Sequence, residues 1–381
     1  MRILFGLFIL IFFLGCSNAN NQTDRAVDPT PGLITNNQYA RGFRIDTFAQ
    51  AFQLTLFDPW NQGKIFDQYL ILPKGSVEKE GLEQKNIIYL PLGKWAVSST
   101  THIGFMSALG EADRIVGCTS PDRVYNSELS ARYLCGELTR IGSDMEFNFE
   151  SVLGIEPDII LQTVFEGQRN KDRRLADTGV NLLYILEWME PHPLGRAEWI
   201  KVFALLLNKK AEADSIFQLV SNHYCSLKKL AENMDAKPLV MVGNNYNGTW
   251  YMPGGQNYMC RYLEDAGFDY PLFETDSRGS LALNFENVLV QFRTADVWLG
   301  VSSRSLNNLL EEDPRYAVFD PINKNNVYSV NGRVNSLMGN DFWESGVVYP
   351  DRILADMVRI AHPQLLPDHV VSYYKKLPGE H

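Results

Sequence analysis

Short apolar runs alternate with longer amphipathic segments along most of the chain. Apolar runs typical of buried strands occur at residues 86–90 (NIIYL) and 239–243 (LVMVG). Each leads through a loop with aromatic residues to a helical segment that ends in a glycine turn, at Gly110 and Gly267. This alternation predicts parallel strands covered by helices, because strands that run the same way need a crossover segment between them.

A six-residue motif occurs twice and defines two similar halves. Residues 148–153 read NFESVL and residues 284–289 read NFENVL. Each motif leads to a short apolar strand that follows an acidic residue, at residues 157–161 (PDIIL) and 295–299 (ADVWL). The shared order of elements around the motifs predicts an α/β protein of two Rossmann-like lobes with mainly parallel sheets.

A long helical pattern lies between the two halves. From about Leu194 to Met234, apolar positions recur at helical spacing, while Lys and Glu occupy the other side. Pro193 suits the first turn of such a helix, and Pro238 lies beyond its end. We expect the lobes to be joined by a single long helix, about 60 Å long for about 40 residues. A packed helix would restrict hinge motion, whereas a loop would allow it.

The N-terminus carries the pattern of an export signal. Arg2 precedes a mostly apolar stretch over residues 3–14, and Gly15 and Cys16 follow. The stretch is shorter than the roughly 20 residues that span a bilayer, so it is typical of a signal peptide. Residues 13–16 (FLGC) resemble a bacterial lipobox, which implies cleavage before Cys16 and lipidation of its sulfur. An ordinary signal peptide with an incidental cysteine is the alternative.

These patterns divide the chain into five predicted segments. We expect a lipoprotein signal peptide at residues 1–15, a flexible tether at 16–32, an N-terminal lobe at 33–192, an inter-lobe helix at 193–236 and a C-terminal lobe at 237–381. The tether is rich in Asn, Asp, Thr, Pro and Gly and has no apolar period. Residues 34–72 alternate aromatic and apolar positions, and we expect them to add strands to the N-terminal lobe.

Composition and charge place the chain among globular proteins. The hydrophobic fraction is 45% and the charged fraction 21%, which excludes general disorder. The formal net charge is -10, from 35 basic and 45 acidic residues, and this balance argues against a nucleic-acid binder. A length of 381 residues favours two domains over one.

The sequence lacks the motifs of several common enzymes and metal sites. It contains no G-x-S-x-G, H-E-x-x-H or G-x-x-x-x-G-K-[ST] pattern. Its six histidines include no pair at i, i+4, so a preformed metal face is unsupported. We expect no enzyme activity, no resident cofactor and no metal site. Disulfides and free thiols are both open for Cys118, Cys135, Cys225 and Cys260.

Aromatic residues gather in the loops that follow corresponding strands of the two halves. Trp95 lies in such a loop of the first half, and Tyr246, Trp250 and Tyr251 lie in the matching loop of the second. Matching loops of related lobes would face each other across a cleft, where their rings could stack on a flat ligand. Packing within each lobe is the alternative for these rings.

Four further residues are candidate ligand contacts. His102 lies at a strand-to-helix turn, where α/β proteins bind ligands, although a histidine there can simply bond to backbone. Arg304, Arg333 and Trp343 lie in polar loops after strands of the second half. An arginine in such a loop could pair with a carboxylate or amide oxygen of a ligand, or remain a solvated surface charge.

Glu150 and Glu286 occupy equivalent positions in the repeated motif. Asn148 and Asn284 make good helix N-caps, and an acidic residue in the first turn complements the helix dipole. First-turn side chains can also stay exposed. One acidic side chain on each lobe could then meet arginines on a two-fold symmetric partner.

Together these features resemble a known family. The lipobox, the paired motif and the joining helix are similar to those of periplasmic substrate-binding proteins for iron chelates and cobalamin, whose two lobes are joined by a rigid helix. The resemblance covers roughly residues 85–365 and is most specific at residues 112–126 (ADRIVGCTSPDRVYN) and 141–161. It implies capture of a metal chelate between the lobes and delivery to the permease dimer of an ABC importer.

The resemblance also implies residue roles and a location. Glu150 and Glu286 match the family's permease-docking glutamates, and ligand contacts would come from the loops that hold Trp95 and Trp250. A monomer held by lipid on Cys16 at the periplasmic side of a bacterial membrane is implied as well. The competing ligands are a corrinoid such as cobalamin and a ferric siderophore or haem. Stacking aromatic residues and the low number of clustered charges favour a large, fairly neutral chelate such as a corrinoid, since a carboxylate-rich siderophore should need several Arg or Lys residues.

Two alternatives to chelate transport stay open. The first is direct zinc or manganese binding for an ABC importer, which needs several His and carboxylate side chains around one ion. The second, from another class, is an exported hydrolase.

Overall fold

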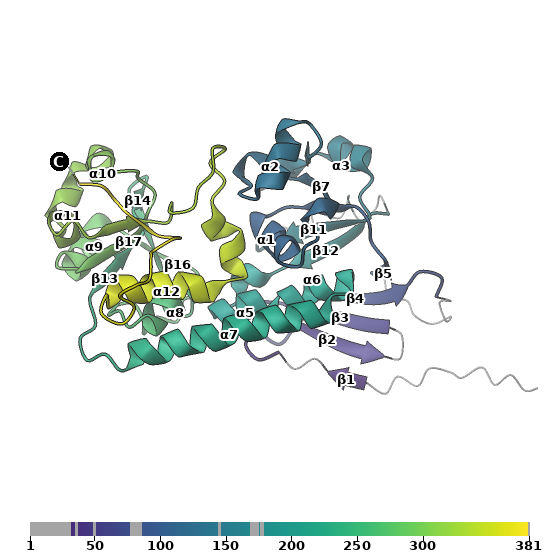
Figure 1. Cartoon of the computed structure of the whole chain (residues 1–381), viewed down its shortest axis with the longest axis horizontal. Helices are drawn as coiled ribbons and strands as arrows, with labels where there is room; N and C mark the ends of the chain where they lie inside the picture. The colour runs from purple at the N-terminus through teal and green to yellow at the C-terminus, as the bar shows by residue number, and fades with distance from the viewer. Residues whose placement is uncertain are drawn as a thin grey trace, which may run out of the picture.

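The computed structural model describes residues 32–34, 37–48, 51–76, 86–143, 146–167, 175 and 179–379. The expected signal peptide, almost all of the expected tether and Cys16 lie outside the described residues. The described chain forms two α/β lobes, an additional antiparallel sheet and a set of joining helices (Figure 1).

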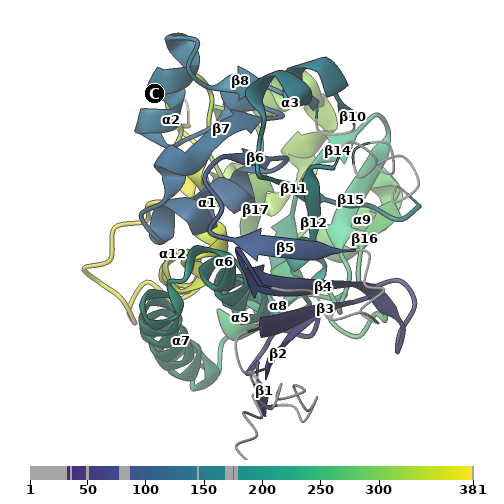
Figure 2. The ribbon, with the colours of Figure 1, turned by 90° about the vertical axis from the view of Figure 1, so that its right-hand side faces the viewer.

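A mainly antiparallel sheet forms the first part of the chain. Its order is β1-β2-β3-β4-β5, and only the pair β4 and β5 is parallel. The strands are β1 (Gly32–Ile34), β2 (Phe43–Phe48), β3 (Ala51–Phe57), β4 (Ile65–Pro73) and β5 (Ile87–Leu90). Figure 2 shows this sheet below the N-terminal lobe. The strands expected at residues 34–72 are therefore present, but they form a separate sheet that also takes the apolar run at residues 86–90.

The N-terminal lobe contains a fully parallel sheet of order β12-β11-β6-β7-β8. The strands are β6 (Trp95–Val97), β7 (Ile115–Cys118), β8 (Thr139–Arg140), β11 (Ile159–Thr163) and β12 (Asn181–Ile185). The helices are α1 (Thr100–Ala108), α2 (Ser127–Leu134) and α3 (Phe149–Ile155), and a small hairpin joins β9 (Gly142–Ser143) to β10 (Glu146–Phe147). Near-continuous apolar strands fit a sheet that is covered on both faces.

The C-terminal lobe repeats this plan in a shorter form. Its main sheet has the order β13-β17-β18-β19, in which only β19 is antiparallel. The strands are β13 (Val240–Val242), β17 (Val297–Val301), β18 (Val327–Ser329) and β19 (Lys375–Lys376), beside a second sheet of β14 (Asn245–Tyr246), β15 (Thr249–Pro253) and β16 (Ser280–Leu283). The helices are α8 (Tyr258–Asp265), α9 (Phe285–Phe292), α10 (Leu306–Glu312), α11 (Asp320–Asn323) and α12 (Pro350–Ala361).

The joining segment is helical, but it is divided into three helices. These are α5 (Pro193–Glu198), α6 (Ile200–Leu207) and α7 (Lys210–Glu232). Asn208 has a left-handed backbone with φ of 56°, which ends α6 and redirects the chain into α7. Asparagine tolerates this conformation better than most residues, so the expected continuous helix breaks at this point.

Helix α7 packs against both lobes. Ala213 and Phe217 belong to the apolar core of the N-terminal lobe, whereas Tyr224 and Leu227 belong to that of the C-terminal lobe. Figure 1 shows the helix running below the two lobes. Because one rigid helix contributes to two cores, the relative orientation of the lobes is restricted.

Candidate ligand-binding cleft

Polar residues follow the strands at the carboxyl edge of the N-terminal parallel sheet, a position where α/β proteins usually bind ligands. In the N-terminal lobe these are Ser98 after β6, Thr119 after β7 and Thr163 at the end of β11. Thr119 Oγ1 donates to Ser98 O over 3.0 Å, and Thr163 N donates to Ser98 Oγ over 2.7 Å. These bonds hold three adjacent strand ends in one polar wall.

A cavity of about 690 Å³ lies between this wall and a segment of the C-terminal lobe. The N-terminal lobe contributes six hydroxyl side chains to the lining: Ser98, Ser99, Thr100, Thr119, Ser120 and Thr163. It also contributes Arg123 and Phe165, and the C-terminal lobe contributes Leu337, Met338, Asn340 and Trp343. The cavity therefore combines many hydrogen-bonding groups with a few large apolar surfaces, and its volume is typical of small-molecule sites.

Residues 333–348 cross from the C-terminal lobe to the N-terminal lobe, and we call this segment the strap. Asn335 Nδ2 donates to Val124 O over 2.8 Å, and Thr100 Oγ1 donates to Trp343 O over 3.0 Å. At Gly339 a Cβ atom would lie 2.2 Å from Val124 O, so only glycine permits this close approach. Val347, at the end of the strap, is part of the N-terminal core. The strap thus closes one side of the cavity.

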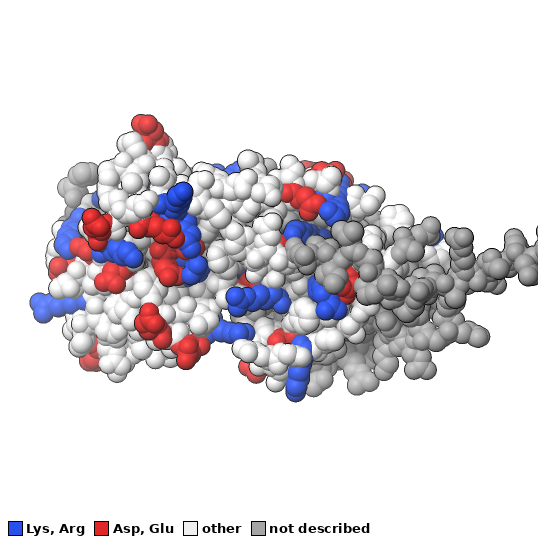
Figure 3. Space-filling model, turned by 90° about the horizontal axis from the view of Figure 1, so that it is seen from below, with Lys and Arg blue, Asp and Glu red and all other residues white. Residues whose placement is uncertain are grey.

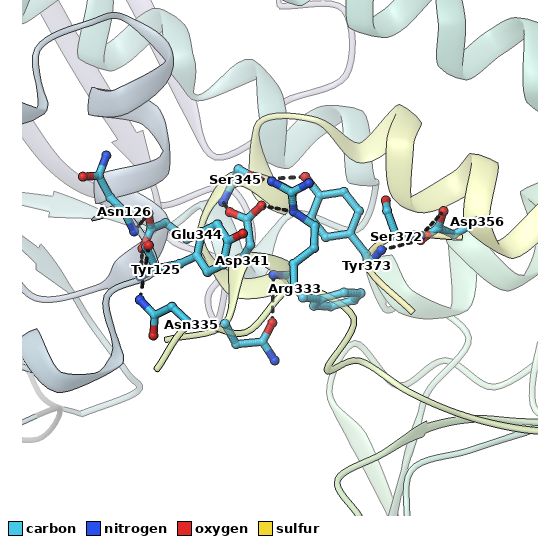
Figure 4. A network of polar contacts seen from close by, with 12 residues as sticks. Tyr125, Asn126, Arg333, Asn335, Asp341, Glu344, Ser345, Asp356, Ser372 and Tyr373 are labelled. Atoms are coloured by element: carbon cyan, nitrogen blue, oxygen red, sulfur yellow. Dashed lines mark hydrogen bonds and ion pairs between the residues drawn. The ribbon is translucent and has the colours of Figure 1, made fainter. Parts of the chain in front are cut away.

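A buried carboxylate fastens the strap to the N-terminal lobe (Figure 4). Glu344 accepts hydrogen bonds from the backbone N–H groups of Tyr125 and Asn126, over 2.7 and 2.8 Å. Burial raises the pKa of Glu344 from 4.5 to about 7, and repulsion from the Asp341 carboxylate adds a smaller increase. The two backbone hydrogen bonds oppose the shift because they stabilise the charged form. Asp341 itself forms a 2.6 Å ion pair with Arg333.

His102 lies behind the polar wall rather than in the cavity. Its ring is fully buried, and Nε2 lies 3.2 Å from Thr163 Oγ1. Burial lowers the pKa of His102 to about 3, so the ring is neutral at ordinary pH. The histidine therefore orients a cavity hydroxyl, and the structure shows no surface of it for a ligand.

The aromatic candidates divide between core and surface. Trp95 is the first residue of strand β6 and is fully buried, which corrects its expected loop position. Trp250 is also fully buried, and its indole N–H donates to Val242 O over 2.8 Å. Both rings fill cores, as the packing alternative stated. Tyr246 and Tyr251 are 68% and 52% exposed on strands β14 and β15, and neither contributes to the cavity lining.

The remaining candidates lie on or beside the strap. Trp343 lines the cavity and is 44% exposed. Arg333 belongs to the strap, where its guanidinium lies over the rings of Tyr125 and Tyr373 and pairs with Asp341 (Figure 4). Arg304 is exposed, and its Nη2 atom lies 3.7 Å from Met338 Sδ. Of the expected contacts, only Trp343 lines the cavity directly.

Several lining residues were absent from the sequence-based candidates. They are the hydroxyl residues around Ser98 and Thr119, together with Arg123, Phe165 and Met338. The run Ser98-Ser99-Thr100-Thr101 directly after a strand was a usable signal, since polar residues at strand ends commonly face ligands. No comparable signal marks Met338, because its place depends on the path of the strap.

Glu150 and Glu286 are exposed in the first turns of α3 and α9. Asn148 Oδ1 accepts from Ser151 N over 3.1 Å, and Asn284 Oδ1 accepts from Asn287 N over 2.8 Å. The two N-caps expected from the motif are therefore confirmed. The docking role of the glutamates stays a prediction.

Other expectations concern metals, thiols and membranes. The part of the chain that the structure describes holds no group of three or more His, Cys, Asp or Glu side chains placed to bind a metal ion. Cys118, Cys135, Cys225 and Cys260 are free thiols. Among the described residues, no helix is long and apolar enough to cross a membrane.

Comparison with known proteins settles the family. Residues 96–334 match the periplasmic binding protein family. The chain belongs to this family. An uncharacterized lipoprotein of Methanocaldococcus jannaschii is 26% identical over 318 residues, which cover 80% of this chain and 73% of the relative. A second lipoprotein of the same organism is 23% identical over 392 residues, covering 97% and 96% of the two chains.

Solved periplasmic binding proteins share the fold. A haem-binding protein from Pseudomonas aeruginosa superposes with a TM-score of 0.58 at 14% identity, covering 76% of this chain and all (100%) of that one. CeuE of Helicobacter pylori, in a complex with nickel and histidine, gives a TM-score of 0.56 at 18% identity, covering 74% and 86%. These structural similarities confirm the expected fold class of this periplasmic binding protein.

Proposed function

We propose that this protein captures a metal chelate in the cavity beneath the strap and delivers it to the permease dimer of an ABC importer. The observation that carries the proposal is the cavity itself. It lies at the carboxyl edge of a parallel sheet, where strand ends supply hydroxyl groups, and residues of both lobes line it. A binding protein needs such a site and no catalytic group.

The lining is suited to a large, partly polar ligand. Hydroxyl groups and Arg123 can bind peripheral oxygen atoms, while Trp343 and Phe165 offer apolar faces that are 44% and 38% exposed. Structural neighbours that bind haem, including HutB of Vibrio cholerae at a TM-score of 0.54, support a chelate as cargo. The candidate ligands are haem, a corrinoid such as cobalamin, and a ferric siderophore.

Transport also requires a location and a partner. The proposed anchor is a lipid on Cys16, supported by two relatives that are themselves lipoproteins. The proposed permease contacts are Glu150 and Glu286, one exposed carboxylate on each lobe. Direct zinc or manganese binding gains no support from the described residues, which contain no cluster of suitable ligands.

A ligand panel tests the proposal. Purified protein is titrated with haem, cobinamide, cobalamin and ferric siderophores, and binding is followed by quenching of tryptophan fluorescence. We expect one chelate to bind with a dissociation constant of about 1 μM or tighter. Failure of every chelate, combined with a stoichiometric metal ion in the freshly purified protein, would instead favour direct metal transport.

A further inference from the structure

Met338 occupies an unusual position at the tip of the strap. Its side chain lines the cavity and is 57% exposed, although methionine is usually buried. Its backbone has a φ of 66°, in the left-handed region that few non-glycine residues adopt. Such conformations persist where the surrounding structure imposes them, and they are frequent at ligand sites.

Asn335 holds this conformation in place. Its Oδ1 atom accepts hydrogen bonds from Leu337 N and Gly339 N, over 3.1 and 2.8 Å. Met338 N donates to Asn335 O over 3.1 Å, which closes the turn. Since Asn335 Nδ2 also donates to Val124 O, the turn that presents Met338 is fixed to the opposite lobe.

Three described residues of the lining have side chains that commonly ligate transition metals, namely Cys118, Asp122 and Met338. Cys118 is 3% exposed, and burial raises the pKa of its thiol to about 12, so it stays protonated. The Asp122 carboxylate is paired with the Arg140 guanidinium. The thioether of Met338 carries no proton to lose. Its sulfur accepts one hydrogen bond from Arg304 Nη2 over 3.7 Å, and the second lone pair of the thioether remains available.

We propose that Met338 is an axial ligand to the metal of the bound chelate, and that the cargo is therefore a flat macrocycle with an open axial position. This inference rests on the proposed function. Binding is a ligand exchange, in which a sulfur lone pair forms a bond to iron or cobalt and a water molecule leaves, with no change of oxidation state. Thioethers are soft ligands that serve as axial ligands to haem iron.

The proposal separates the candidate cargoes. A macrocycle binds its metal in one plane and leaves axial positions for Met338, and its faces can stack on exposed aromatic rings such as Trp343. A ferric siderophore surrounds its iron with hard oxygen ligands, so a thioether has no site on the metal. The position of Met338 thus favours haem or a cobinamide-type corrinoid over a siderophore.

The test uses absorption and magnetic circular dichroism spectra of the full chain mixed with haem, cobinamide or a ferric siderophore. With a macrocycle we expect a sulfur-ligated spectrum that Met338→Leu abolishes, while affinity falls by about tenfold. Met338→His should restore an axially ligated spectrum, now with nitrogen. Met234→Leu, just beyond the C-terminus of α7, is the matched control and should leave the spectrum unchanged. Thermal unfolding checks that each variant is folded.

Two results would overturn the axial ligand without harming the proposed function. One is a macrocycle complex whose spectrum is the same in wild type and Met338→Leu. The other is tight binding of a ferric siderophore alone. If no chelate binds to folded wild-type protein, the proposed function fails together with the inference.

Discussion

Single residues show how the protein uses buried carboxylates to fasten distant segments. Glu344 is 3% exposed and both of its oxygens accept backbone N–H groups from the other lobe. Burial disfavours its charged form, and the nearby Asp341 carboxylate adds to this effect. The side chain therefore fastens the strap while making its stability sensitive to pH.

The first prediction concerns this pH dependence. The folded pKa of Glu344 is about 7, above its ordinary value of 4.5, so between these values the folded state binds more protons than the unfolded state. The contribution of Glu344 to stability should therefore fall as pH rises through this window, by up to about 3 kcal/mol. Denaturant unfolding of wild type and Glu344→Gln at several pH values measures the difference.

Glu344→Gln should gain stability relative to wild type as pH increases from 4.5 to 7. Glu128→Gln, exposed on α2, is the control for a change of charge at the surface. Parallel stability curves for wild type and Glu344→Gln would show that the carboxylate does not titrate in this range.

The second prediction distinguishes a tryptophan that stabilises the fold, Trp250, from one expected to contact the ligand, Trp343. Trp250 is fully buried among aromatic rings, and its ring centroid lies 5.6 Å from that of Trp298. Trp250→Ala should therefore reduce the free energy of unfolding by about 3–5 kcal/mol. Trp343 lines the cavity, so Trp343→Ala should weaken ligand binding by about tenfold. Denaturant unfolding and ligand titration of both variants make the comparison. A stable Trp250→Ala protein with impaired binding would reverse this assignment.

At the level of elements, helix α5 anchors the segment just before strand β2 of the antiparallel sheet. Glu198 is fully buried on α5 and accepts hydrogen bonds from the backbone N–H groups of Gln38, Tyr39 and Ala40, over 2.9, 2.8 and 2.8 Å. Lys201 Nζ lies 2.6 Å from the same carboxylate. A single side chain therefore satisfies three backbone donors of a segment about 160 positions away in the chain.

The third prediction follows from that anchor. Glu198→Ala leaves three N–H groups and Lys201 without their acceptor, and should lower the free energy of unfolding by about 3–5 kcal/mol. Glu212→Ala, exposed on α7, should change it by less than about 0.5 kcal/mol. Equal effects of the two substitutions in denaturant unfolding would refute the anchoring role.

At the scale of the whole molecule, helix α7 and the strap both connect the two lobes. Helix α7 contributes to both cores, and the strap adds a second crossing that ends in the N-terminal core. Seen from below (Figure 3), acidic and basic side chains lie side by side, without an extended area of one sign. A restricted orientation of the lobes limits how far the exposed carboxylates of α3 and α9 can move apart. The proposed docking on a two-fold symmetric permease depends on such a limit.

The fourth prediction tests this arrangement. Glu150→Arg combined with Glu286→Arg should leave chelate affinity nearly unchanged but abolish uptake in a transport assay, because both side chains are exposed and outside the cavity lining. Glu128→Arg combined with Glu311→Arg places the same charge change on other exposed positions and should preserve uptake. Normal transport by the first variant would exclude the docking role.

The repeated α/β plan and the helix starts at Asn148 and Asn284 follow from the amino-acid sequence alone. Those signals are local, since strand and helix periodicity and N-caps depend on residues close together in the chain. By contrast, the pairing of residues 86–90 with a separate sheet and the break of the joining helix at Asn208 depend on contacts between distant parts of the chain.

The cavity depends on the tertiary structure even more strongly. Whether an aromatic ring such as Trp250 is buried or exposed depends on what packs against it, and no periodic pattern carries that information. The strap reaches the N-terminal lobe through contacts more than 200 positions apart, such as Glu344 with Tyr125. Local sequence could therefore indicate that two lobes exist, but the residues between them were set by long-range packing.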